Sequence, residues 1–289
     1  NLMNIKISTS LNTIEDYAFA GCENLKQIEF PEGIININGY AFSACNNLET
    51  VIFSHTLETI AGTAFIRCNN LKNIEIAEGN ENLTLENGIL LCENDINKLT
   101  EMIIILEEAI DTETNTFVVP DSVTFLQNEI LDQYTNITTV QIPASVQIIA
   151  PLFIGKEITN VIIVNPKYEV IGNAVYTKGT ENEAVTMVRY FGNEEIVNVK
   201  EGTEIIGEYC FRDKNLSQII LPETLEEIKP QAFLYCNNLK SLSLGEKVKT
   251  FNSMSIYGSG IEEIILSENH PYFRIEEGAI CNGEKVKAL

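Results

Sequence analysis

Apolar residues return along this chain in a frame of 23 positions, with polar residues at fixed places between them. Each frame holds an isoleucine, Ala-Phe four residues later, then a cysteine, a leucine and two alternating apolar residues. In the first part of the chain these are Ile14, Ile37 and Ile60; Ala18-Phe19, Ala41-Phe42 and Ala64-Phe65; Cys22, Cys45 and Cys68; Leu25, Leu48 and Leu71; and Ile28, Val51 and Ile74. A period of roughly 20–50 residues is typical of solenoid proteins.

The same frame returns late in the chain, at Ile206, Cys210-Phe211 and Leu216 and at Ile228, Ala232-Phe233, Cys236 and Leu239. As a rule the unit reads P-x5-I-x3-A-F-x2-C-x-N-L-x2-I-x-I. Complete units occupy 8–30, 31–53, 54–76, 120–142, 143–163, 200–221, 222–244 and 245–266. The unit at 120 has Ile130-Leu131 for Ala-Phe, the unit at 143 is two residues short, and the last one carries Ser255-Ile256. We therefore expect a single solenoid domain over 1–289, with repeats at 8–76, 120–163 and 200–266.

The end of each unit predicts a β-strand, because its last two apolar residues alternate with polar ones. Such a strand buries its apolar face by stacking on equivalent strands about 4.8 Å away. The units therefore predict a curved, right-handed solenoid of parallel strands. The expected strands are Ile5–Ile7, Ile28–Phe30, Val51–Phe53, Ile74–Ile76, Val140–Ile142, Val161–Ile163, Ile219–Leu221, Leu242–Leu244 and Ile264–Leu266.

The phenylalanine of each unit predicts an aromatic stack on the far side of the core, where the preceding alanine permits close approach of successive coils. The stack is expected to contain Phe19, Phe42, Phe65, Phe211 and Phe233. Prolines at 31, 120, 143 and 222 stand where strands are expected to end, because proline cannot donate a ladder hydrogen bond.

Three interruptions, at about 77–119, 164–199 and 267–289, share a turn followed by apolar residues. The motifs are Asn87-Gly88-Ile89-Leu90-Leu91, Gly172-Asn173-Ala174-Val175-Tyr176 and Glu277-Gly278-Ala279-Ile280-Cys281. The first two are followed by a polar turn and a second apolar segment, Met102–Leu106 and Val185–Tyr190. We interpret the interruptions as β-hairpins inserted between blocks of repeats.

The unit, its Ala-Phe and Cys-x-Asn-Leu signatures and the hairpin insertions resemble the BspA-like leucine-rich repeats over essentially all 289 residues. The resemblance implies a leucine-rich-repeat solenoid with a parallel β-sheet on one face, irregular coil and short turns on the other, and inserted β-hairpins. The family typically occurs in secreted or surface-attached bacterial proteins and in some mucosal protists, where members are implicated in adhesion to host or matrix proteins. An extracellular or cell-surface location is thus also implied.

The acidic net charge of the chain argues against some classes of binding partner. The chain has 41 acidic and 19 basic residues and a formal net charge of −22, which repels phosphate backbones and anionic lipid. We therefore expect no nucleic-acid partner. A membrane helix needs an apolar run of about 18 residues, and the nearest candidate, Met102–Leu106, is five residues long. Membrane insertion is not expected. The start has no signal-peptide pattern and falls in the tail of a repeat, as in a trimmed protein.

Candidate catalytic and metal-binding residues are few. The chain has two histidines, His55 and His270, both expected in turns and without a nucleophile motif nearby. No C-x2-C pair, EF-hand loop or P-loop is present, so we expect no catalytic residue, no bound metal and no cofactor. Weak calcium binding by surface acidic clusters stays open.

The cysteines and asparagines keep the repeat spacing, which favours structural ladders. Strands in register hold equivalent Cβ atoms about 4.8 Å apart, whereas a disulfide prefers about 3.8 Å, so we predict reduced thiols at Cys22, Cys45 and Cys68. Asparagine caps turns and tolerates left-handed backbone, so a capping ladder is favoured over a ligand-binding row. The row contains Asn24, Asn47, Asn70, Asn136, Asn215 and Asn238.

The outward positions of the strands are the candidate binding surface. Ile52, Ile162, Ile220 and Ile265 share one repeat position between two inward residues, and Glu29, Glu75 and Glu263 flank them. A rigid sheet presents such side chains without an ordering cost. We therefore predict a non-catalytic module that binds a host or matrix protein, or a glycan, through this face. The alternatives are contact through the hairpins, or an architectural spacer, which would keep this face polar.

Overall fold

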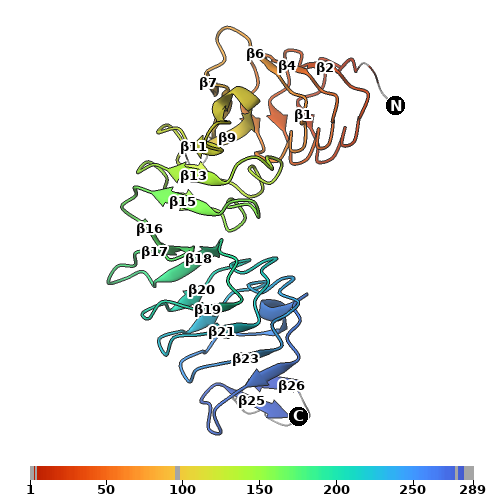
Figure 1. Cartoon of the computed structure of the whole chain (residues 1–289). Coiled ribbons are helices and arrows are strands. Elements are labelled where there is room, and N and C mark those ends of the chain that lie inside the picture. The colour runs from red at the N-terminus through yellow and green to blue at the C-terminus, as the bar shows by residue number, and fades with distance from the viewer. Residues whose placement is uncertain (1–2, 4, 95–97, 277–278, 283–289) are drawn as a thin grey trace. The chain divides into compact units, whose positions relative to one another are not determined.

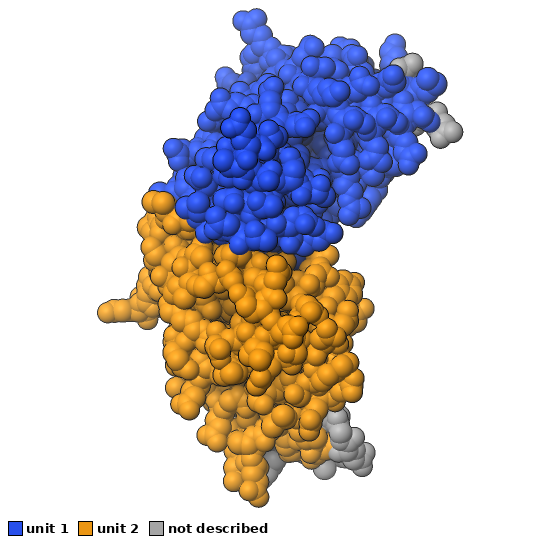
Figure 2. Space-filling model, viewed as in Figure 1, with its two compact units in different colours: residues 1–162 blue, residues 163–289 orange. Residues whose placement is uncertain are grey.

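The computed structural model describes the chain except for residues 1–2, 4, 95–97, 277–278 and 283–289. Short strands joined by turns make up nearly all of it (Figure 1). The chain divides into two compact units, residues 1–162 and 163–289, which Figure 2 shows in different colours. Within the described residues, no helix has the length and apolar character needed to cross a membrane.

The strands of the first unit are two to seven residues long. They are β1 (Thr13–Ile14), β2 (Gln27–Glu29), β3 (Asn36–Ile37), β4 (Thr50–Phe53), β5 (Thr59–Ile60), β6 (Asn73–Ile76), β7 (Leu83–Glu86), β8 (Ile89–Asn94), β9 (Leu99–Ile105), β10 (Ile110–Asp111), β11 (Thr116–Val118), β12 (Phe125–Leu126), β13 (Thr139–Ile142), β14 (Ile148–Ile149) and β15 (Asn160–Ile163). One 3-10 helix, η1 (Glu107–Ala109), lies between β9 and β10.

The second unit has the same kind of element. Its strands are β16 (Tyr168–Ile171), β17 (Ala174–Thr177), β18 (Thr186–Tyr190), β19 (Ile196–Asn198), β20 (Ile205–Ile206), β21 (Gln218–Ile220), β22 (Glu227–Ile228), β23 (Ser241–Ser243), β24 (Glu263–Ile265), β25 (Phe273–Glu276) and β26 (Ala279–Asn282). A second 3-10 helix, η2 (Ser253–Ile256), is capped by the side chain of Asn252.

The predicted parallel strands are confirmed at every position after the first. Strands β2, β4 and β6 pair in parallel, and residues 23 apart face one another, as Gln27 faces Thr50 and Thr50 faces Asn73. Strands β11, β13 and β15 form a second parallel sheet in the first unit, and in the second unit β19 pairs with β21 and β23 with β24. We call these strands the first ladder. The sequence period is therefore the register of this ladder.

The predicted strand at Ile5–Ile7 is wrong, because those residues are not a strand. Ile7 is nevertheless buried and Ile5 packs against the core. An apolar pattern predicts that side chains are buried, whereas a strand also needs hydrogen bonds to a neighbouring backbone. At Ile5–Ile7 only the burial is present.

A second parallel ladder, which the repeat pattern did not predict as strand, runs through the isoleucine that precedes Ala-Phe. Strands β1, β3 and β5 pair in parallel, with Ile14 opposite Ile37 and Ile37 opposite Ile60. The ladder includes β9, β12 and β14 in the first unit and β18, β20 and β22 in the second. Each coil therefore closes around its core with strands on two sides, joined by tight turns.

The first two interruptions contain the predicted antiparallel hairpins. Strands β7, β8 and β9 form an antiparallel meander, as do β16, β17 and β18. Asn87 and Gly88 join β7 to β8 with φ of 47° and 79°, as expected of a two-residue hairpin turn of type I′. In the third interruption β25 and β26 pair antiparallel, whereas the predicted turn at Glu277-Gly278 and residues 283–289 lie outside the described residues.

Both of the first two interruptions also supply ladder strands. In 77–119, β9 pairs in parallel with β12 in the second ladder and β11 pairs with β13 in the first. In 164–199, β18 pairs with β20 and β19 pairs with β21. Each is therefore a coil of the solenoid with an added hairpin, and not a hairpin alone.

The predicted aromatic stack is confirmed within each unit. The rings of Phe42 and Phe65 are 5.3 Å apart and nearly parallel, and Phe19 stacks on Phe42 at 5.1 Å. In the second unit Phe211 stacks on Phe233 at 5.3 Å. A column that the repeat rule missed, Phe30 on Phe53 at 5.5 Å, meets the first one edge to face. Such offset and edge-on pairs add about 0.5–1.5 kcal/mol each beyond area burial.

Cysteine and asparagine side chains tie successive coils together. The thiols of Cys45, Cys68 and Cys236 donate to the carbonyl of the phenylalanine in the preceding coil, at 3.2, 3.2 and 2.9 Å. The amides of Asn47 and Asn70 donate to carbonyls of the preceding corner, at 2.6 Å each. The capping ladder is confirmed at these two asparagines, and all seven cysteines are free thiols.

Several repeats lack the cysteine, and two of them place a long polar side chain at its position. Tyr134 occupies that position in the unit at 120, and its hydroxyl donates to Ile105 O at 2.5 Å. Lys214 occupies it in the unit at 200, where the ammonium lies 5.8 Å from the ring centre of Tyr190. Burial lowers the pKa of Lys214 to about 8. The ladder position therefore tolerates polar side chains other than cysteine.

Most regular coils turn through two residues of left-handed backbone, and the coil at 54–76 through one, at Arg67. The residue before Ala-Phe has φ near +57°, as in Tyr17, Tyr40 and Gln231. The residue before the cysteine is also left-handed, with φ of 70° at Gly21 and 57° at Ala44. Left-handed backbone costs a residue with Cβ about 1–2 kcal/mol, so only Gly21 adopts it without strain.

Replacing Ala44 with glycine should therefore leave stability unchanged or raise it by up to about 1 kcal/mol, because relief of strain outweighs the added freedom of the unfolded chain. The control is Ala41→Gly, at a fully buried position without positive φ, which should lose about 1 kcal/mol or more. Urea denaturation measures both. Equal losses in the two variants would contradict the assignment of strain to Ala44.

Candidate binding surface

The outward face of the first ladder is set by strict alternation. In β2 the side chain of Ile28 is buried, whereas Gln27 and Glu29 point to solvent. The same alternation holds in β13, β21 and β23, where the central residue is buried and its neighbours are exposed or half-buried. All seven residues predicted for the binding surface lie in first-ladder strands, on this outward face.

Three of the predicted residues are direct neighbours in the first unit. Ile52 faces Glu29 on one side and Glu75 on the other in the ladder register. Both glutamates are exposed and Ile52 is half-buried. The arrangement places one apolar side chain between two carboxylates, which suits a partner with an apolar contact flanked by cationic or hydroxyl groups.

The sheet of β11, β13 and β15 has a more apolar outward face. Ile162 on β15 is 44% exposed, and Val118 on β11 is 54% exposed. Val118 faces Gln141 of β13, which occupies the same repeat position as Ile162. Val118 was missed from the sequence because it lies within an interruption; its position two residues before Pro120, matching Glu29 before Pro31, was the available signal.

In the second unit Ile220 on β21 is 49% exposed and Ile265 on β24 is 44% exposed. Ile265 faces Ser243 of β23, and Glu263 lies two residues before it on the same exposed face. Ile196 on β19, also exposed and also missed from the sequence, faces Gln218. The predicted residues therefore occupy separate sheets in two units, each with its own apolar side chains.

The other candidate chemistry takes structural roles. His270 accepts hydrogen bonds at Nδ1 from the backbone N–H of Tyr272 and Phe273, so its Nε2 donates to Gly245 O at 2.9 Å. His55 pairs with Glu32 at 2.6 Å on the exposed surface. Among the described residues, no group of three or more histidine, cysteine or acidic side chains is arranged to hold a metal ion.

Parallel ladders at a 23-residue period, closed by Cys-x-Asn-Leu corners, define a leucine-rich-repeat solenoid. The chain matches the family model of the BspA type leucine rich repeat region, in six copies, over residues 1–102, 109–196 and 189–287. It therefore belongs to the BspA-type leucine-rich-repeat family, as the sequence resemblance implied.

Solved structures of bacterial repeat proteins are similar to this chain. A leucine-rich repeat protein from Eubacterium ventriosum is 19% identical, with 88% of this chain and 76% of that one covered and a TM-score of 0.47. A leucine rich cell surface protein from Faecalibacterium prausnitzii is 16% identical, covering 88% and 90%, with a TM-score of 0.36. The pneumococcal vaccine antigen PcpA is 18% identical, covering 86% and 61%, with a TM-score of 0.43. No curated protein matches.

Proposed function

We propose that this protein is a non-catalytic recognition module of the bacterial cell surface or extracellular space, which binds a host or matrix protein or a glycan through the outward face of its first ladder. The family and the name of the Faecalibacterium relative support the location. The face itself supports the binding role.

The observation that carries the proposal is the exposure of β-branched side chains at one repeat position. Val118, Ile162, Ile220 and Ile265 each hold that position and stand at least 44% exposed. A single exposed isoleucine is normal on any surface. Within each unit, side chains that keep the same place on rigid parallel strands present a preformed contact, which loses little conformational entropy on binding.

An architectural spacer accounts less well for this face. A spacer needs its outward strand positions to be polar, as they are at Glu29, Gln141 and Ser243. Apolar side chains between those positions favour association and give a spacer no advantage. The exposed isoleucines therefore favour recognition over spacing.

The test is a double variant, Ile162→Ser with Ile220→Ser, measured against immobilised extracellular-matrix proteins and a glycan array that bind the unmodified chain. We expect at least a tenfold loss of affinity, because buried apolar anchors dominate interface energy. The matched control is Ile148→Ser with Ile171→Ser, which removes similarly exposed isoleucines from strands outside the first ladder.

The control should stay within twofold of the unmodified chain, and circular dichroism should show both variants folded. Unchanged affinity in the folded Ile162→Ser/Ile220→Ser variant would contradict the proposal and place the contact on the hairpins.

A further inference from the structure

Each regular coil has a corner that contains Ala-Phe and the cysteine. The backbone of this corner donates hydrogen bonds to the same corner of the next coil. Phe19 N donates to Ala41 O at 2.7 Å, and Phe42 N donates to Ala64 O at 2.8 Å. The next residue of the series is Phe65, and the coil that follows it is the interruption at 77–119. That coil reaches both ladders but turns through η1, so it has no Ala-Phe corner. Phe65 N has no acceptor among the described residues.

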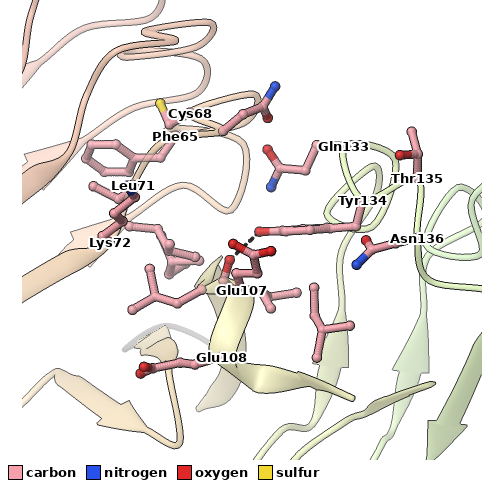
Figure 3. A pocket seen from close by; sticks show the side chains of 16 residues that line it. Phe65, Cys68, Leu71, Lys72, Glu107, Glu108, Gln133, Tyr134, Thr135 and Asn136 are labelled. Carbon is pink, nitrogen blue, oxygen red and sulfur yellow. Dashed lines mark hydrogen bonds between the residues drawn. The ribbon is translucent and has the colours of Figure 1, made fainter. Parts of the chain in front are cut away.

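A pocket of about 420 Å³ occupies the place of the missing corner (Figure 3). Its apolar walls include Phe65, Cys68 and Leu71 from one coil and Ile103–Leu106 from β9 and the residue after it. Gln133, Tyr134 and Thr135 of the next complete coil line the opposite side. The volume is within the roughly 300–1,000 Å³ usual for ligand sites.

Burial of equivalent residues shows that the pocket replaces a packed neighbour. Leu48, which has a regular coil on both sides, is 0% exposed, whereas Leu71 at the pocket is 8% exposed. The thiols follow the same trend, with Cys45 fully buried and Cys68 slightly open. The wall of the pocket is therefore a coil surface shaped to receive another coil.

One side chain of the protein already substitutes for part of the missing corner. Ala44 N donates to Ile66 O at 2.9 Å, and the equivalent Arg67 N donates instead to the amide oxygen Oε1 of Gln133 at 2.5 Å. A carboxamide thus takes the place of a backbone carbonyl. Two further backbone groups of this coil have no such substitute among the described residues. Phe65 N lacks an acceptor. Asn69 O lacks an asparagine donor, whereas the equivalent Glu23 O and Asn46 O each accept from one.

Charge at the mouth of the pocket is also unpaired. Lys72 and Glu107 both line it, and neither forms an ion pair with another described residue. A peptide segment satisfies all of these groups together, because it carries carbonyls, amides, apolar side chains and charges of either sign in one strand. A purely apolar ligand would leave Phe65 N and Asn69 O unsatisfied, at a cost of about 1–3 kcal/mol each.

We propose that this pocket binds a turn of a partner protein with the chemistry of the missing corner. Its carbonyl accepts from Phe65 N, an asparagine amide donates to Asn69 O, and a following leucine packs on Leu71. The site is separate from the outward face of the first ladder.

The probe is a synthetic peptide with the sequence of residues 41–51 and Cys45→Ser, so that it includes the Ala41 carbonyl, titrated into the full chain labelled with 15N. We expect saturable binding and slower hydrogen exchange at the Phe65 amide, while the Phe42 amide, already bonded, stays unchanged. A peptide that also carries Asn47→Ala and Leu48→Ala should bind at least tenfold more weakly. Failure of the first peptide to saturate at millimolar concentration would overturn the proposal.

The matched variants are Thr135→Trp, which fills the pocket from its rim, and Asn46→Trp, which places the same ring at the same repeat position of a regular corner. Both positions are exposed, so both variants should fold. Thr135→Trp should weaken peptide binding at least tenfold and Asn46→Trp less than twofold. Equal effects, or a Phe65 amide as protected as that of Phe42 in the free chain, would overturn the proposal. The Ile162→Ser/Ile220→Ser variant should bind the peptide normally, which separates this site from the proposed sheet contact.

Discussion

Replacing Phe42 with alanine is expected to lower the free energy of unfolding of the first unit by about 3–5 kcal/mol. Phe42 is fully buried, stacks between Phe19 and Phe65, and meets Phe30 edge to face. The substitution removes the middle ring of the column and leaves a cavity that rigid ladders on both sides cannot close. Urea denaturation followed by circular dichroism measures the loss.

The control is Phe19→Ala, at the same repeat position. Phe19 is only partly buried and stacks on Phe42 alone, so we expect roughly half the loss. Equal losses in the two variants would show that stacking within the column does not contribute, and that area burial alone sets the cost.

Raising the pH above 9 is expected to destabilise the second unit through its cysteines. Burial raises the pKa of both Cys210 and Cys236 from the ordinary value of 9.0 to about 12. Between these values the unfolded state has lost the thiol proton and the folded state keeps it. Stability is therefore fully present below pH 9 and falls as pH rises, by up to about 1.4 kcal/mol per pH unit for each thiol.

The measurement is the free energy of unfolding at pH 8 and pH 10.5 for the unmodified chain and for Cys210→Ser with Cys236→Ser. Serine keeps a donor for Phe211 O, which Cys236 now satisfies, and does not titrate in this range. Tyr176 and Tyr190, whose pKa values burial also raises, remain in both proteins and cancel in the comparison. An unchanged pH slope in the double variant would refute the role of the thiols.

Sequence periodicity predicts the first ladder almost residue by residue, because parallel pairing of identical units makes the period and the register the same quantity. Ile28 and Val51 face one another and both point into the core. A shift of the strand pairing by one residue would turn such an apolar side chain to solvent, so burial fixes the register. The phenylalanine stack and the asparagine ladder follow for the same reason. Because the units are equivalent, a correct prediction for one unit holds for the others.

The sequence periodicity did not predict the shortest strands or the strained backbone positions. The strands of the second ladder are two residues long, as in Thr13–Ile14, too short for any alternation to be visible. The left-handed turns occur at Tyr40 and Ala44, residue types that do not usually favour such backbone. Of the second set of turn positions, Gly21 carried a clear sequence signal and Asp213 a weaker one.

The sequence by itself therefore determined the family, the coil and the outward face on which Ile162 and Ile220 lie. Tertiary structure decided what the interruptions do. The chain at 77–119 has no repeat signature, yet β9 and β11 each add a strand to the sheets of the coils that follow, because an exposed sheet edge is satisfied by any backbone that can pair with it. The Ala-Phe corner needs specific side chains that this segment lacks, so the packing of that corner stops here, and the pocket beside Phe65 and Tyr134 is the result.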